Sequence, residues 1–171
     1  IDKEYSIYKE ALEKDYFCKR ADGPYMKGKV WPGECNFPDY TNPAVREWWA
    51  GLFKELISDI GVKGVWNDMN EPAVMEVPNK TFPMDVRHDY DGNPCSHRKA
   101  HNIYGTQMAR ATYHGVKRFA YPKRPFVITR YAYAGAQRYT SSWTGDNVAT
   151  WEHLWIANIQ VQRMSISGMG F

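Results

Sequence analysis

Two aspartates of this chain have neighbours that suit chemistry: one follows a predicted buried strand, which aims its carboxylate rigidly into a cleft, and the other follows a glycine in an aromatic loop. Asp68 follows the predicted buried strand Val62–Trp66, and Asp146 lies in Trp143-Thr144-Gly145-Asp146-Asn147. Two carboxyl groups can cleave a glycosidic bond when one attacks the anomeric carbon and the other, with a raised pKa, protonates the leaving oxygen. Taken singly, each aspartate is more typical of a turn or a helix cap. The pair makes the more specific hypothesis.

Aromatic side chains accompany both acids. The chain holds 7 Trp and 12 Tyr, and flat rings suit the apolar faces of a pyranose. Trp31, Trp66 and Trp143 fall at predicted loops or strand ends, whereas Trp48 and Trp49 belong to a predicted helix. Because aromatic residues pack cores more often than they bind sugars, composition alone leaves both interpretations open.

Helices and strands alternate along the chain. Thr41-Asn42-Pro43 predicts a helix start, apolar residues spaced by three and four continue the helix to Ile57, and Gly61 ends it. The other predicted elements are a helix around 8–17, a strand over 62–66, a loop over 73–96, a helix over 101–119, a strand over 126–129, a helix over 150–164 and a strand starting near Gly168.

This alternation predicts an α/β fold with a parallel sheet. The polar residues Asp68, Arg130 and Asp146 each follow a predicted strand or the loop beyond it, and in a parallel barrel that edge carries the chemistry. The 171 residues fall short of the ~250 that a complete eight-fold barrel needs. The chain starts at Ile1 and ends in an apolar run, so we expect a fragment of a longer protein.

Composition argues against several other classes of protein. The net charge of +3 comes from 22 basic and 19 acidic residues without a basic stripe, which argues against a nucleic-acid partner. No apolar run approaches the ~18 residues of a membrane span. The glycines are scattered singly, so no phosphate-binding loop is expected.

The sequence predicts neither a metal nor another cofactor. Its 3 cysteines include no Cys-x-x-Cys pair, although a bond between Cys18 and Cys35 stays open. His97 and His101 would share a helix face, but Arg98 occupies the place where zinc proteases carry glutamate.

Several blocks of the sequence resemble glycoside hydrolase family 31. Trp66-Asn67-Asp68-Met69-Asn70-Glu71 is similar to the family's catalytic segment, and the likeness extends over nearly the whole chain. The segment His97–Gly105 resembles the branch of α-glucosidases and glucosidase II. The remaining matching blocks, in the family's order and spacing, are Val30–Gly33, Phe37–Pro43, Trp48-Trp49, Arg124–Arg130 and Trp143–Asn147.

The resemblance implies a (β/α)8 TIM barrel, of which residues 1–171 would form an incomplete part around the central to C-terminal strands. It implies a retaining, exo-acting α-glucosidase that takes oligosaccharides with a terminal α-linked glucose. Asp68 would be the nucleophile and Asp146 the acid/base. The implied glucose-binding residues are Arg130, Trp31, Trp66, Met69 and Trp143, with Glu71 as a supporting carboxylate.

Two departures from the family's pattern bear on the site. The family also uses an upstream aspartate and a downstream histidine, and neither region is in this chain. Arg130 is followed by Tyr131-Ala132-Tyr133, where many relatives carry a smaller residue. The alternatives are another α-glycosidase, a transglycosylase, or a non-catalytic glycan-binding relative. We expect the isolated chain to be inactive and prone to associate, because a partial barrel leaves sheet edges unpaired.

Overall fold

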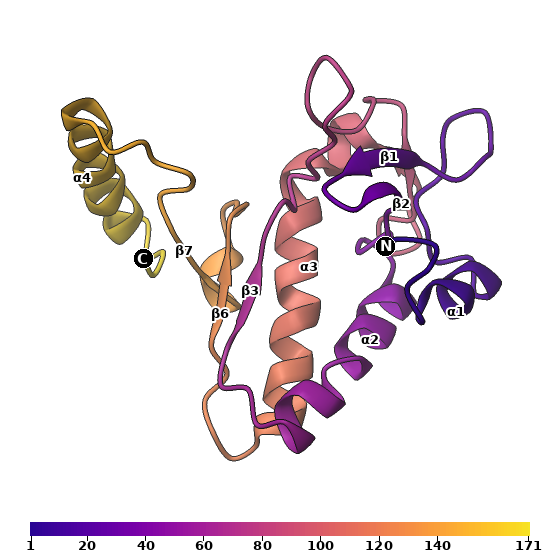
Figure 1. The fold of residues 1–171 in the computed structure, drawn as a ribbon, viewed down its shortest axis with the longest axis horizontal. Coiled ribbons are helices and arrows are strands. Elements are labelled where there is room, and N and C mark those ends of the chain that lie inside the picture. Colours follow the sequence, from indigo (N-terminus) through magenta and orange to yellow (C-terminus); the bar gives the residue numbers. More distant parts are fainter.

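A parallel sheet forms the centre of the computed structural model, which describes all 171 residues (Figure 1). Its three strands run in the order β3 (Val65–Asn67), β6 (Val127–Thr129) and β7 (Ser141–Ser142). Asn67 is in register with Thr129, and Thr129 with Ser142. All three strands therefore end at one edge of the sheet, and the residues that follow them are neighbours.

The long helix α3 (His97–Ala120) lies against the sheet, and α2 (Pro43–Gly51) packs on α3 (Figure 1). The side chain of Asn42 accepts a hydrogen bond from the backbone N–H of Ala44, as the sequence predicted for this helix start. The predicted single helix is interrupted after α2. The chain continues as a π-helical turn, η1 (Glu55–Asp59), before Gly61 adopts a φ of +84°.

Small elements surround this centre on the N-terminal side. Helix α1 (Tyr8–Glu13) precedes an antiparallel hairpin of β1 (Lys27–Val30) and β2 (Gly33–Asn36). A second antiparallel pair joins β4 (Arg87–His88) to β5 (Cys95–Ser96) within the predicted loop.

Two apolar clusters hold these elements together. The larger cluster connects α1, α2 and the start of α3 through Ala11, Val45 and Tyr104, all at most 2% exposed. The smaller one lies between η1, α3 and β6, with Ile57, Val116 and Val127 among its members. The sheet is thus anchored from the side of α3.

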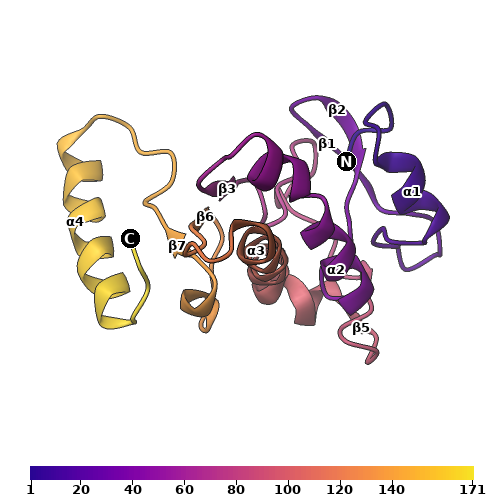
Figure 2. The same ribbon diagram turned by 90° about the horizontal axis from the view of Figure 1, so that it is seen from below.

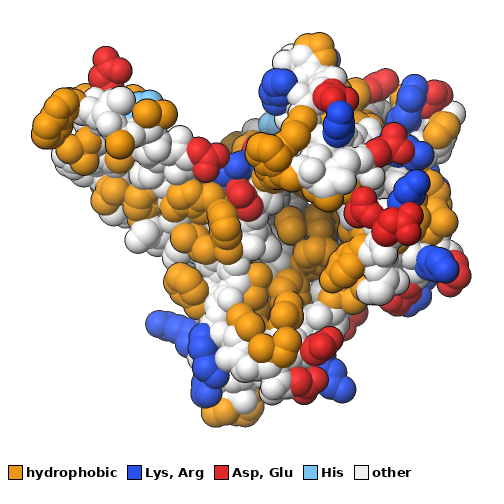
Figure 3. Space-filling model, viewed as in Figure 1, with side chains coloured by type: hydrophobic (Ala, Val, Ile, Leu, Met, Phe, Trp, Pro, Cys, Tyr) orange, Lys and Arg blue, Asp and Glu red, His pale blue; other side chains and the backbone are white.

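Helix α4 (Trp151–Ile166) has no buried residue and stands apart from the other helices (Figures 1 and 2). Thr150 caps it by accepting a hydrogen bond from the backbone N–H of His153. Its exposed side chains include Trp151 at 86%, Trp155 at 66% and Ile166 at 88%. Hydrophobic side chains cover this helix in the space-filling view (Figure 3). The expected association of the isolated chain stays a prediction. No helix combines the length and apolar character needed to span a bilayer.

The predicted order of helices and central strands is confirmed, with shifted boundaries. Strand β3 begins at Val65 rather than Val62, and α3 begins at His97 rather than His101. The strand predicted near Gly168 is wrong, because these residues form no strand, although the carbonyl of Gly170 accepts a hydrogen bond from the N–H of Ser142. Strand β7 was missed because its two serines show no apolar pattern.

Candidate active site

The parallel register brings the predicted site residues together at the ends of the strands. Asp68 follows β3 and Arg130 follows β6, and the backbone N–H of Arg130 donates to the carbonyl of Asn67. Trp143 follows β7 and leads to Asp146. Three segments that are distant in sequence therefore reach the same edge of the sheet.

Arg130 is the centre of this site. Its guanidinium binds Glu71 with two hydrogen bonds, from Nε at 2.8 Å and from Nη2 at 2.9 Å. The third nitrogen, Nη1, lies 3.2 Å from Oδ1 of Asp68 and 3.4 Å from Oδ2 of Asp146. Hydrogen bonding to Glu71 raises the pKa of Arg130 above its ordinary value. One half-buried cation thus joins three carboxylates.

The backbone around Asp68 holds its carboxylate in place. Met69 has a φ of +54°, in the left-handed region that residues other than glycine rarely adopt. In this conformation its N–H donates to Oδ1 of Asp68 at 2.8 Å. The Asp68 side chain is 32% exposed, so it keeps access to solvent and to a ligand.

Asn70 connects the loops that carry Asp68 and Arg130, a role that we had not assigned from the sequence. It is 3% exposed, and its Nδ2 donates to Oγ1 of Thr129 and to the carbonyl of Gly105. Its Oδ1 accepts from the N–H of Tyr131. The Asn-Asp-Met-Asn-Glu block pointed to this residue, but only the fold shows its partners.

Two of the predicted tryptophans meet at the site and the third does not. The rings of Trp66 and Trp143 lie edge to face with centroids 5.5 Å apart, and Trp66 is 62% exposed. Trp31 is at the tip of the β1–β2 hairpin and is 81% exposed. No hydrogen bond, ion pair or aromatic contact links Trp31 to Asp68 or Asp146.

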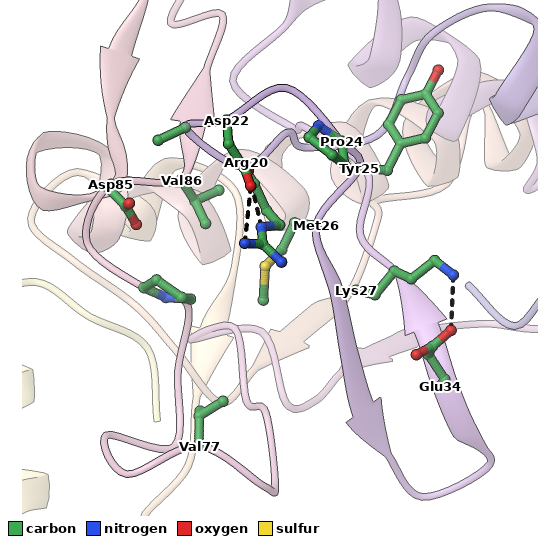
Figure 4. A pocket seen from close by; sticks show the side chains of 12 residues that line it. Arg20, Asp22, Pro24, Tyr25, Met26, Lys27, Glu34, Val77, Asp85 and Val86 are labelled. Carbon is green, nitrogen blue, oxygen red and sulfur yellow. Dashed lines mark hydrogen bonds and ion pairs between the residues drawn. The ribbon is translucent and has the colours of Figure 1, made fainter.

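Asp68 and Met69 line a small cavity of about 180 Å³, together with Tyr40 and Trp49. A larger cavity of about 990 Å³ lies between residues 20–27 with the facing Glu34 of β2 on one side and the loop over 77–86 on the other (Figure 4). The larger one contains no predicted site residue, and the ion pairs Arg20–Asp22 and Lys27–Glu34 neutralise charge on its wall. The chemistry of the strand-end carboxylates, rather than cavity size, identifies the candidate site.

A separate cluster contains residue types that ligate metals. Cys18, Asp39 and His88 bring one ligand atom each within 4.8 Å of one another, and all three are buried. Asp39 is already hydrogen-bonded to His88 at 2.9 Å and to Thr41, and it also accepts from the backbone N–H of Asp89. His97 Nε2 lies 3.0 Å from His101 Nδ1, a hydrogen-bond distance. These donor atoms are already satisfied within the protein.

A pair of carboxylates at the carboxyl ends of parallel strands is typical of glycoside hydrolases with a barrel fold as a class. Residues 1–171 match the family model described as the glycosyl hydrolases family 31 TIM-barrel domain. The chain belongs to glycoside hydrolase family 31 and forms part of its TIM-barrel domain.

Similar proteins agree with this membership. The chain is 48% identical to alpha-glucosidase 2 of Bacillus thermoamyloliquefaciens over 172 residues, which is 99% of this chain and 21% of that protein. It is 41% identical to human neutral alpha-glucosidase C over 174 residues, covering 100% of this chain and 19% of that protein. The catalytic subunit in a crystal structure of the ER glucosidase II heterodimeric complex superposes with a TM-score of 0.88 at 40% identity, covering 100% of this chain and 19% of that one.

The chain therefore spans about a fifth of the length of the relatives it matches. These two sequence relatives are named as α-glucosidases. The matched region includes every residue of the candidate site, from Trp31 to Asp146.

Proposed function

We propose that residues 1–171 form part of the (β/α)8 catalytic domain of a longer, retaining, exo-acting α-glucosidase. Asp68 is the nucleophile and Asp146 is the general acid/base. The substrate is an oligosaccharide that ends in an α-linked glucose. This proposal combines the names of the relatives with the geometry around Arg130.

One observation carries the mechanistic part of the proposal. Nη1 of Arg130 contacts both Asp68 and Asp146, at 3.2 and 3.4 Å. Because one nitrogen contacts an oxygen of each aspartate, these two oxygens cannot lie further apart than the two contact distances added together. This upper limit reaches only the lower end of the ~6.5 to 9.5 Å separation of inverting pairs. This limit is compatible with a retaining pair, for which ~5 to 5.5 Å is expected.

The reaction proceeds by double displacement. The carboxylate of Asp68 attacks the anomeric carbon while Asp146 gives its proton to the glycosidic oxygen, so the glycosidic bond breaks and a glycosyl ester forms. Asp146, now ionised, takes a proton from water. That water attacks the anomeric carbon and releases Asp68. Two inversions at the anomeric carbon return glucose in the α configuration.

The other site residues bind and orient the sugar. Arg130 is fixed by two bonds to Glu71, so Nη1 is free to exchange its contacts with the aspartates for sugar hydroxyls. Trp66 and Trp143 present aromatic surface beside the acids, and Met69 lines the small cavity next to Asp68. Trp31 lies at the exposed hairpin tip, apart from the two acids, and its place in the sugar site stays a prediction.

Asp146 needs shielding from water to act as an acid near neutral pH. Its side chain is 89% exposed in these 171 residues. The shielding therefore comes from the bound sugar and from parts of the catalytic domain beyond the matched region. For this reason the isolated chain is expected to be inactive.

The first experiment traps the glycosyl ester in the full-length enzyme with 5-fluoro-glucosyl fluoride. We expect one glycosyl unit on the peptide that contains Asp68, found by mass spectrometry, and α-glucose as the first anomer in a hydrolysis followed by NMR. Asp68→Asn should prevent labelling. Asp59→Asn, a change at an exposed position on η1, should leave it intact.

Three results would contradict the proposal. A label on another residue would move the nucleophile, and β-glucose as the first product would show inversion. Sugar binding without an adduct would favour the glycan-binding alternative. Rates on maltose, isomaltose and nigerose give the linkage preference, and product analysis at high sugar concentration identifies a transglycosylase.

A further inference from the structure

A row of three histidines runs through the interior from Asp39 to the first turns of α3. Oδ1 of Asp39 lies 2.9 Å from Nδ1 of His88, and Nε2 of His88 lies 2.9 Å from Nδ1 of His97. Nε2 of His97 then lies 3.0 Å from Nδ1 of His101. His88 is 2% exposed and His97 is fully buried. The proposed mechanism assigns no role to these four residues.

The carboxylate at one end sets the direction of every hydrogen bond in the row. An ionised aspartate only accepts, so His88 donates from Nδ1, and in the neutral form of the ring the lone pair is then on Nε2. That lone pair accepts from Nδ1 of His97, and Nε2 of His97 accepts from Nδ1 of His101 in the same way. Each ring is therefore held in one tautomer and one orientation.

The surrounding residues shield the histidine row from solvent except at its outer end, which is His101. Asp39 also accepts from Thr41 and from the N–H of Asp89, so its carboxylate cannot rotate freely. Burial raises the pKa of the neighbouring Cys18 thiol and of the Tyr104 hydroxyl, so both stay neutral beside the row. Only the ring of His101 is partly exposed, and its Nε2 has no partner within the chain.

The outer end of the row meets the candidate site. The ring of His101 lies edge-on to the ring of Tyr131, with centroids 5.7 Å apart. The Tyr131 hydroxyl donates to Asn102 on α3, and its backbone N–H donates to Asn70. Tyr131 directly follows Arg130 in the chain. The position of the histidine ring thus bears on the loop that carries the sugar-binding arginine.

We propose that His101 is a positioning residue for the glucose site, held by its hydrogen bond to His97 and acting through Tyr131 on Arg130. This inference rests on the proposed function, because it assigns Arg130 to the sugar. A role in packing alone would need only the ring of His101. In this proposal the hydrogen bond to His97 is needed as well, because it holds the ring against Tyr131.

Two substitutions at His101 separate these possibilities in the full-length enzyme. His101→Gln keeps a hydrogen-bonding group within reach of His97 but removes the ring. His101→Phe keeps a ring against Tyr131 but removes the hydrogen bond. We expect His101→Phe to raise KM about 5- to 10-fold, the effect of losing one buried hydrogen bond, while kcat stays within about 2-fold. His101→Gln loses the ring contact with Tyr131, so it should raise KM to a similar extent.

Glucose binding, measured by titration calorimetry in an Asp68→Asn background, gives a readout without turnover. Both His101 variants are expected to bind glucose more weakly than the Asp68→Asn protein with His101 in place. Thermal unfolding of each variant reports whether it is folded. A His101→Phe enzyme with wild-type KM and glucose affinity would overturn the inference, because the hydrogen bond to His97 would then be dispensable. A His101→Gln enzyme with both values unchanged would also overturn it, because the ring would then not act on Tyr131. Full activity of Asp68→Asn alone would instead refute the proposed function, and the calorimetric comparison would still decide the role of His101.

Discussion

At the scale of single residues, the site depends on the fixed shape of one guanidinium. Two nitrogens of Arg130 donate hydrogen bonds to Glu71, and the third faces Asp68 and Asp146. A lysine has one compact ammonium group and cannot hold Glu71 from two directions while facing the aspartates. The planarity of the arginine, as well as its charge, organises the carboxylates.

Arg130→Lys should therefore lower kcat/KM of the full-length enzyme about 10- to 100-fold, which corresponds to ~1.5 to 3 kcal/mol for lost hydrogen bonds to charged groups. Steady-state kinetics with maltose measures the change. Arg124→Lys is the matched control, because Arg124 is exposed and makes no ion pair. If both variants kept wild-type kcat/KM, the central role of Arg130 would be wrong.

At the scale of elements, the close approach of α2 to α3 fixes the helix that supports the sheet. Gly115 on α3 faces the backbone of α2, and a Cβ at this position would lie 2.5 Å from the carbonyl oxygen of Ala50. Backbone atoms cannot give way as a flexible side chain does, so only glycine fits here. Trp49 adds a hydrogen bond from its Nε1 to Thr112 at 3.0 Å.

Gly115→Ala should destabilise the protein by about 1 to 3 kcal/mol, because the helices must move apart. Gly51→Ala is the matched control, because a Cβ there would meet nothing within 4 Å. On the end of α2 it should be neutral or stabilising by up to about 1 kcal/mol. Thermal unfolding of both variants measures the difference. Equal effects would show that the α2–α3 contact is not tight.

At the scale of the whole molecule, the buried histidines make stability depend on pH. Burial, together with the nearby His88 and His101, lowers the pKa of His97 from 6.5 to about 3. The folded state therefore binds this proton less readily than the unfolded state, and the unfolded state holds more protons between pH 6.5 and about 3. Stability present above pH 6.5 is lost as the pH falls through this window.

The free energy of unfolding of the wild type should fall, relative to His97→Gln, by up to about 1.4 kcal/mol for each pH unit below 6.5. Denaturant unfolding at several pH values between 7.5 and 4.5 measures this difference. Taking the difference between the two proteins removes the contributions of their shared titrating groups. A difference that did not change with pH would show that His97 titrates normally in the folded protein.

The amino-acid sequence by itself determined the family, the order of the elements and the identity of the candidate acids. Local patterns carry this information: Asn42-Pro43 starts a helix, apolar runs make strands, and the block around Asp68 is contiguous in the chain. The strand near Gly168 was predicted wrongly, and β7 was missed, because a strand of two residues depends on its neighbours rather than on its own composition.

Only the tertiary structure decided which side chains meet. The parallel register of β3, β6 and β7 aligns Asn67, Thr129 and Ser142, and this alignment places Arg130 between Glu71 and the two aspartates. The same holds for the histidine row, which begins at Asp39 and continues on β4 and α3. The spacing of apolar residues along a helix or strand determines which face of that element a residue occupies. Its partner across space depends on how separate elements pack, because contacts between distant segments are set by the fold as a whole.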